Sequence, residues 1–286
     1  MIGLIFELTN KCNLSCKWCG VKKGKDVLSY DKIISIIEKN KPKWVEFTGG
    51  EPLLRKDIFD LIDYCKSRRT YTCLNTNGTL INDKIAKRLN ADIIRISIDG
   101  LEKVNDKIRG KGSFKKAVNA IESLKKHNKK IIISTAIGKL NKNEPKKIIK
   151  YFYPRIKNFM FGRVLPTPEL KYKECISTLE TIKIYLSLLP YRLNPLLRIN
   201  YAMQFGALFY FNFIPPEVLA DGKVISCCID RGNVIGSIKQ NKKLRSKPCL
   251  LFFSNCEKCL RHYFKNDNLR KHGFRRFEIA TQFRNL

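Results

Sequence analysis

The sequence lacks a long apolar run: no segment approaches the roughly 18 consecutive apolar residues that a membrane-spanning helix needs. The N-terminal stretch has no basic region before its short apolar run and no small-residue cleavage site, so it does not resemble a secretion signal. Fixed-period repeats and low-complexity tracts are also missing. We therefore expect a soluble, cytoplasmic protein with no membrane partner. With 286 residues, 44% of them hydrophobic, the chain can bury a substantial core.

Acidic residues are scarce: 25 Asp and Glu stand against 56 Lys and Arg, which gives a formal net charge of +31. An imbalance of this size favours a polyanionic partner, although it says nothing about the fold. The positive charge is spread along the chain, and an AT-rich genome would itself enrich lysine. The charge therefore suggests a class of partner without identifying one.

Histidine is nearly absent, and the three that occur show no metal-ligand spacing with one another: His127, His262 and His272. Cysteine, by contrast, occurs eleven times. The odd count, the tight clusters and the missing secretion signal argue against a disulfide framework and favour reduced thiolates that hold metal. Three thiols lie outside the clusters and are expected to be buried and inert: Cys65, Cys73 and Cys175.

Over the first two-thirds of the chain, short apolar runs alternate with amphipathic stretches. The apolar runs predict strands at 4–9, 44–48, 71–75, 93–98, 131–137 and 159–164. The amphipathic stretches predict helices at 29–40, 56–66, 83–90, 113–127 and 144–153, the first with Ser29 as its N-cap. Six strand–helix alternations indicate an α/β fold, with a parallel sheet and helical crossovers.

Beyond residue 190 this pattern changes. The dipeptide "DG" at 221–222 lies between two apolar runs and predicts a hairpin. We therefore expect two units: residues 1–195 as the parallel-sheet unit, and residues 196–286 as a small cysteine-rich unit with a basic tail.

The stretch "CNLSCKWCG" at 12–20 places Cys12, Cys16 and Cys19 in the loop after the first predicted strand. Thiolates are soft ligands suited to iron–sulfur clusters and zinc, and loops at the carboxyl ends of parallel strands are where α/β folds place reactive groups. Three thiolates can hold three corners of a four-iron cluster and leave the fourth iron open. A structural zinc site would need a fourth ligand, and none lies near in the sequence.

This Cys-x3-Cys-x2-Cys loop, with Trp18 before its last cysteine, resembles the signature of the radical SAM superfamily. The stretch "TGGEPLLR" at 48–55 resembles the turn that receives the amino group of S-adenosylmethionine (SAM) in that family. Two glycines let backbone approach a ligand closely, and backbone carbonyls and a carboxylate are acceptors for an ammonium group. The resemblance therefore implies that Gly49, Gly50 and Glu51 bind SAM.

Two further stretches, "LNTNG" at 74–78 and "RISIDGLEKVNDKIRGKGSF" at 95–114, resemble later strand ends of the same family. The resemblance implies that Asn77, Ser97 and Asp99 face the SAM ribose and carboxylate side, and that Arg109 pairs with the carboxylate. Ordinary turn chemistry explains the Asn-Gly and Asp-Gly pairs equally well, and Arg109 could be a solvated surface cation.

The resemblance covers about residues 1–195 and implies a partial TIM-type (β/α)6 barrel with a small C-terminal cysteine-rich α+β extension. It also implies a 4Fe-4S cluster and SAM as cofactors, an electron donor such as ferredoxin or flavodoxin, and sensitivity to oxygen. In such an enzyme one electron cleaves SAM, and the resulting 5′-deoxyadenosyl radical abstracts hydrogen from the substrate.

The C-terminal unit carries a second group of thiols that are candidate metal ligands: Cys227, Cys228, Cys249, Cys256 and Cys259. "GKVISC" followed by "CEKC" resembles the auxiliary-cluster pattern of the SPASM and Twitch branches of the superfamily. That pattern expects a further cysteine ahead of Gly222, and the preceding stretch contains none. A second iron–sulfur cluster is expected here, with zinc as the alternative.

Two substrate classes follow. The charge, and the basic and aromatic residues interleaved in the last 26 residues, favour a polyanionic substrate such as RNA or another nucleic acid. Family analogy favours a peptide or protein substrate instead, with Phe274, Phe277 and Phe283 packing a terminal helix. A non-catalytic binding module would require the cysteine loop to be vestigial, although Trp18 and the Gly-Gly-Glu-Pro turn accompany it.

Overall fold

The structure is a computed structural model that describes residues 3–21, 26, 28–164, 173–194 and 196–201, together with the short strands at 217–218, 223–225 and 234–237.

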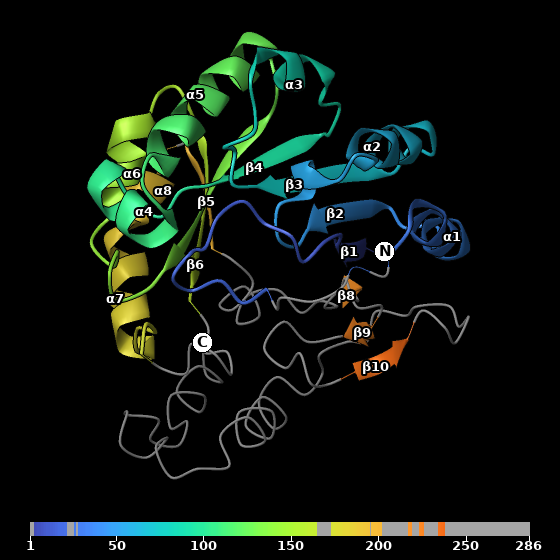
Figure 1. Ribbon diagram of the computed structural model, residues 1–286. Helices are drawn as coiled ribbons and strands as arrows, with labels where there is room; N and C mark the ends of the chain where they lie inside the picture. The colour runs from blue at the N-terminus through green and yellow to red at the C-terminus, as the bar shows by residue number, and fades with distance from the viewer. Residues whose placement is uncertain are drawn as a thin grey trace.

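Seven parallel strands form the main sheet in chain order, and helices cover its outer side (Figure 1). The strands are β1 (Gly3–Glu7), β2 (Trp44–Thr48), β3 (Tyr71–Thr76), β4 (Ile93–Ser97), β5 (Ile131–Ile137), β6 (Asn158–Arg163) and β7 (Arg198–Tyr201). The helices are α1 (Tyr30–Asn40), α2 (Ile58–Ser67), α3 (Asp83–Arg88), α4 (Glu102–Arg109), α5 (Ser113–Lys126), α6 (Pro145–Phe152), α7 (Thr178–Ser187) and α8 (Leu189–Arg192), with a short 3-10 helix, η1 (Pro52–Leu54). The sheet does not close, so the predicted partial-barrel α/β fold is confirmed, with one strand more than the six predicted.

Three short strands extend the sheet beyond β1. β8 (Glu217–Val218) pairs in parallel with β1 and antiparallel with β9 (Lys223–Ile225), and β9 pairs antiparallel with β10 (Val234–Ser237). The antiparallel β8–β9 pair confirms the hairpin predicted at 221–222. The division at residue 195 stays a prediction, and β7, which follows it directly, pairs with β6 in the main sheet.

The two faces of the sheet differ in polarity because side chains alternate along each strand. The face beneath the helices is apolar, and Phe6, Phe47 and Phe159 are completely buried there. On the other face Glu46 accepts a hydrogen bond from Asn75 Nδ2 at 2.6 Å and forms an ion pair with Arg95 Nη1 at 2.8 Å. A polar ladder therefore crosses β2, β3 and β4 on the face away from the core.

The predicted N-cap of α1 is confirmed, because the Ser29 hydroxyl accepts a hydrogen bond from Lys32 N at 3.3 Å. Helix α4, between β4 and α5, was not predicted from the sequence. Within the described ranges no helix is long and apolar enough to cross a membrane.

Candidate active site

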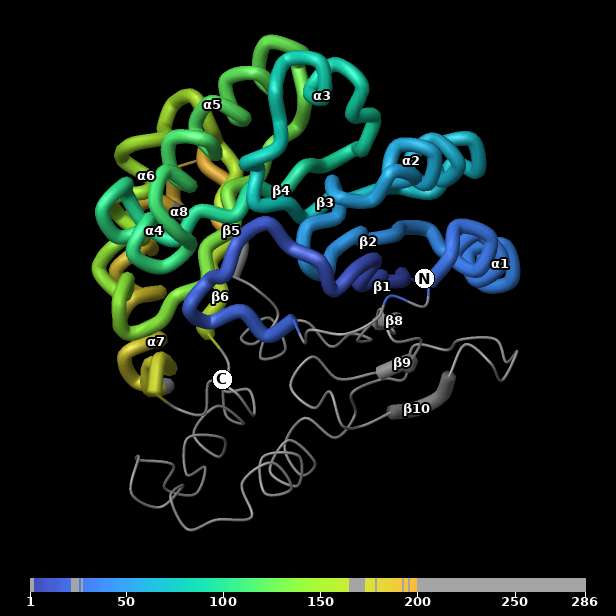
Figure 2. The backbone as a smooth tube through the Cα atoms, viewed as in Figure 1, coloured from blue at the N-terminus to red at the C-terminus, as the bar shows by residue number. Residues whose placement is uncertain are grey.

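The three clustered cysteines lie in one loop after β1, which we call the cysteine loop (residues 9–20). Figure 2 shows this segment in blue, running from β1 across the strand ends towards α4. Cys19 N donates to Cys16 O at 3.2 Å, which closes a turn, and Leu14 N donates to Cys12 Sγ at 3.4 Å. Cys12 and Cys19 are exposed, Cys16 is half-buried, and none forms a disulfide. The loop therefore keeps three free thiols close together in the sequence, two of them in exposed residues.

The Gly-Gly turn after β2 packs directly on the backbone of the cysteine loop. Gly50 N donates to Thr9 O at 2.7 Å, and Glu51 N donates to Lys11 O at 2.8 Å. A Cβ atom on Gly50 would lie 2.1 Å from Lys11 O, and one on Gly49, whose φ is +118°, would lie 2.6 Å from Thr9 O. The approach of the loop thus requires both glycines, which is a structural cause beside the ligand approach proposed from the sequence.

Glu51 is completely buried, and its carboxylate is engaged inside the protein. Oε1 accepts hydrogen bonds from Leu53 N at 3.1 Å and Thr76 Oγ1 at 2.7 Å, and Oε2 accepts one from Asn77 N at 2.8 Å. Burial raises the pKa of Glu51, and these hydrogen bonds oppose the rise. The side chain joins the turn after β2 to the end of β3, and its predicted contact with the SAM ammonium stays a prediction.

Asn77 connects the end of β3 to the cysteine loop. Its amide nitrogen donates to Asn13 Oδ1 at 2.9 Å and lies 4.0 Å from Cys12 Sγ. Its amide oxygen accepts from Thr79 N at 2.8 Å, the turn geometry expected of asparagine. Asn13, which the sequence did not single out, completes the connection because its Nδ2 donates to Thr79 Oγ1 at 2.8 Å.

The last turn of α4 holds the other end of the cysteine loop. Lys17 N donates to Ile108 O at 2.9 Å, and the Trp18 side chain packs in a buried cluster with Ile108 and Val164. Trp18 is 8% exposed, and its Nε1 has no hydrogen-bond partner among the residues that the structure describes. Cys175, expected to be buried and inert, is half-buried against the same cluster.

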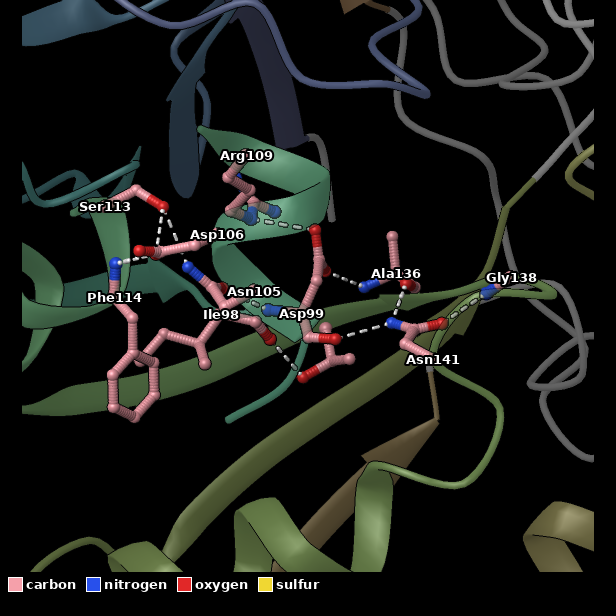
Figure 3. Close-up of polar contacts among 11 residues, drawn as sticks. Ile98, Asp99, Asn105, Asp106, Arg109, Ser113, Phe114, Ala136, Gly138 and Asn141 are labelled. Carbon is pink, nitrogen blue, oxygen red and sulfur yellow. Dashed lines mark hydrogen bonds and ion pairs between the residues drawn. The ribbon is translucent and has the colours of Figure 1, made fainter. Parts of the chain in front are cut away.

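Asp99 and Arg109 form an ion pair beside this contact (Figure 3). Arg109 Nε lies 2.7 Å from Asp99 Oδ2, and Ala136 N donates to Asp99 Oδ1 at 2.9 Å. Arg109 has no second partner within the described part of the chain, so its two terminal guanidinium nitrogens are available to an anion. Ser97, at the end of β4, is partly exposed and pairs in register with Ser134.

Burial and the Arg109 charge have opposite effects on the pKa of Cys16. Burial raises the pKa of Cys16 to about 11, and the Arg109 charge works against this rise. Burial also raises the pKa of Cys12, and Cys19 adds to the rise in both thiols. Bound iron would displace these thiol protons, as thiolate ligation requires.

The donor set fits an iron–sulfur cluster with bound SAM. Three mutually coupled thiols on one loop suit the cluster, and an arginine with two unengaged nitrogens suits a carboxylate. Within the described residues no three His, Cys, Asp or Glu side chains gather closely enough to hold one metal ion. A cluster differs from a single ion in that each thiolate binds a separate iron.

The second group of predicted ligands lies outside the described residues: Cys227, Cys228, Cys249, Cys256 and Cys259. The auxiliary metal site therefore stays a prediction.

Comparison with known families decides the classification. The family model of the radical SAM superfamily matches residues 6–152, which include the cysteine loop, the Gly-Gly turn and the Asp99–Arg109 pair. The chain belongs to the radical SAM superfamily. The superfamily resemblance is thereby confirmed, and membership implies a 4Fe-4S cluster and SAM as cofactors and a SAM-dependent enzyme.

A curated relative is the mycofactocin maturase MftC of Mycobacterium ulcerans, which is 38% identical over 133 residues. The match covers 43% of this chain and 36% of the relative, so the chain spans about a third of the length of that protein.

Two solved structures share the fold over nearly the whole chain. One is anSMEcpe with bound AdoMet and the Cp18Cys peptide, with a TM-score of 0.71, 21% identity, and coverage of 98% of this chain and 85% of that one. The other is Streptococcus suis SuiB bound to the precursor peptide SuiA, with a TM-score of 0.69, 16% identity, and coverage of 98% and 69%. At these identities the two structures show the fold alone.

Proposed function

We propose that this protein is a radical SAM enzyme that modifies a peptide or protein substrate. The observation that carries the catalytic part is the joining of three segments at one edge of the sheet. The cysteine loop bonds to the Gly-Gly turn through Gly50 and Glu51, and to α4 through Lys17. The residues predicted to bind the cluster and the residues predicted to bind SAM thus form one connected structure.

In this proposal Cys12, Cys16 and Cys19 hold three irons of the cluster. The terminal nitrogens of Arg109 bind the SAM carboxylate, and the turn at Gly49–Glu51 orients the ammonium group. When bound, the cluster and SAM supply reductive cleavage to a 5′-deoxyadenosyl radical that takes hydrogen from the substrate. The packed Trp18 cluster keeps water from one side of the loop, because its members are buried apolar side chains.

The relatives support a peptide substrate better than a nucleic acid. The similar curated protein is named a maturase, and both similar structures contain peptides. The net charge of +31 is the observation that favours RNA, and it does not distinguish RNA from an acidic peptide. A peptide with acidic residues satisfies both the charge and the relatives.

Substrate competition tests this choice. Anaerobically reconstituted protein with dithionite and SAM is incubated with an acidic precursor peptide, the same peptide with Gln for Glu, or structured RNA. We expect the acidic peptide to stimulate 5′-deoxyadenosine formation at least about tenfold over the no-substrate rate and to emerge with a changed mass. The Gln peptide serves as the charge control. Stimulation by RNA with a changed nucleoside mass, and none by either peptide, would overturn the peptide proposal.

We also propose an auxiliary iron–sulfur cluster held by Cys256, Cys259 and two of Cys227, Cys228 and Cys249. Thiolates gathered in a small unit can organise it around a metal. A variant with alanine at the three loop cysteines should therefore retain about four irons per chain, the content of one such cluster. Metal analysis and Mössbauer spectroscopy measure this. If the variant holds zinc and no iron, the site is a structural zinc site and not a cluster. If it holds neither metal, both the cluster and the zinc site are refuted.

A further inference from the structure

Hydrogen bonds from neighbouring segments fix the position of Asp99, and with it the Asp99–Arg109 pair. Asp99 is completely buried; Asn105 Oδ1 accepts from its backbone N at 2.9 Å, and Asn141 Nδ2 donates to its backbone O at 2.8 Å. Because Ala136 N also holds Oδ1, the second carboxylate oxygen is fixed where it meets Arg109 Nε. The position of the guanidinium is therefore set by β4 and β5 and does not depend on solvent.

The corner between α4 and α5 is fixed in the same way. Asn105 Nδ2 donates to Ser113 Oγ at 2.9 Å, and Asp106 accepts from Phe114 N at 2.9 Å and from Ser113 Oγ at 3.1 Å (Figure 3). Asp106 thereby caps the start of α5, where a carboxylate is favoured by the unpaired N–H groups. The end of α4, which carries Arg109, cannot shift without breaking this network.

The same end of α4 touches the cysteine loop. Ile108, the neighbour of Arg109, accepts the hydrogen bond from Lys17 N and packs against Trp18. Lys17 and Trp18 lie between Cys16 and Cys19, so the residue that precedes Arg109 contacts the segment between two of the three proposed iron ligands.

The two members of the pair carry opposite charges and meet at 2.7 Å, between Arg109 Nε and Asp99 Oδ2. In a site of low dielectric a nearby cation favours the more negative state of a cluster, and a nearby anion disfavours it. Charges and hydrogen bonds around the thiolates are among the factors that set cluster reduction potentials.

We propose that the buried Asp99–Arg109 pair sets the reduction potential of the cluster at the cysteine loop, with Arg109 raising the potential and Asp99, a positioning residue, holding and partly offsetting that charge. This role is separate from SAM binding, because it acts on the cluster without SAM. It rests on the proposed cluster at the loop and requires no substrate.

The test is the midpoint potential of the reconstituted cluster without SAM, followed by its EPR signal during a redox titration. The loop signal is the one lost when all three loop cysteines are alanine. Arg109→Gln should lower the potential by the equivalent of about a tenfold change in the reduction equilibrium, about 59 mV for one electron. Asp99→Asn should raise it, and Asp99→Asn/Arg109→Gln should lie closer to the parent than Arg109→Gln does.

The Glu46–Arg95 pair supplies the matched control. It has the same chemistry, with a 2.8 Å contact and similarly low exposure. Arg95 lies within β4, whereas Asp99 follows the end of that strand, so the control pair lies further back along the sheet from the strand ends that carry the cysteine loop. Arg95→Gln and Glu46→Gln should shift the equilibrium less than about threefold, because charge interactions weaken with distance.

The outcomes separate this inference from the proposed function. If no signal depends on the loop cysteines, the proposed function and this inference both fail. If the signal is present but Arg109→Gln and Asp99→Asn shift it in the same direction, or no more than the control pair does, the inference alone fails. If Asp99→Asn does not retain iron, the double variant Asp99→Asn/Arg109→Gln is compared with Arg109→Gln. Equal midpoint potentials in these two variants would also overturn the inference.

Discussion

Replacing Cys12, Cys16 and Cys19 together by alanine should reduce SAM cleavage to the uncatalysed background. The three thiols lie within eight residues on one loop, and none forms a disulfide, so we treat them as a single ligand set. Without thiolates the loop has no soft ligand for iron, so no cluster would form beside the Gly-Gly turn. The measurement is 5′-deoxyadenosine formed per chain after anaerobic reconstitution with dithionite.

A matched control separates loss of the site from loss of the fold. Cys65 and Cys73 are completely or almost completely buried in the α2 helix and the β3 strand, away from the cysteine loop. Burial raises the pKa of each to about 12, so both stay protonated and serve as packing groups. Cys65→Ala or Cys73→Ala should retain loop iron and SAM cleavage. Reductive cleavage by the triple loop variant at the parent rate would refute the assignment of the site.

Much of the sheet could be predicted because its strands carry short β-branched runs. The strands at 44–48 and 131–137 were predicted to the residue, and β4 differs by one residue at its end. Such runs are buried beneath helices on one face, so the local pattern and the tertiary environment agree. The cysteine loop and the Gly-Gly turn could be predicted for a different reason: each places several residues of one uncommon type, cysteine or glycine, within a few positions.

Helix α4 was not predicted, because its own sequence pattern is weak. Its eight residues carry two large apolar side chains, Val104 and Ile108, which share one face at a spacing of four residues. Both pack around Trp18, which is far away in the sequence, so the stabilising contact is not local. The spacing of Val104 and Ile108 is the signal that could have suggested this helix.

The positioning network around Asp99 was also invisible in the sequence. Asn105 and Asn141 look like ordinary polar residues, and their roles arise because both bind the backbone of Asp99. Asp99 itself was predicted to face SAM, and the structure engages both carboxylate oxygens within the protein. Asn141 and Ala136 lie 42 and 37 positions from Asp99, so their contacts leave no local pattern and only the fold reveals them.

Gly50→Ala is expected to disrupt the site nearly as strongly as loss of the thiols. The new Cβ would lie 2.1 Å from the Lys11 carbonyl oxygen, and backbone on both sides cannot yield as a flexible side chain could. The turn and the loop would have to separate, which breaks the hydrogen bonds from Gly50 N to Thr9 O and from Glu51 N to Lys11 O. Overpacking and two lost hydrogen bonds together cost about 3 kcal/mol or more. Iron content per chain and 5′-deoxyadenosine formation should both fall at least about tenfold, since a displaced loop cannot hold three thiols at one cluster.

Gly112→Ala is the control for a glycine substitution without a backbone collision. Gly112 has a φ of +77°, but a Cβ there would meet nothing within 4 Å. Its cost is the strain of a left-handed residue alone, about 1–2 kcal/mol. Chemical denaturation should therefore show destabilised protein that still binds loop iron and cleaves SAM, whereas Gly50→Ala loses both. If Gly50→Ala instead kept the iron content and SAM cleavage of the parent protein, the loop could bind iron while separated from the turn. Packing of the Gly-Gly turn on the cysteine loop would then not be what assembles the site.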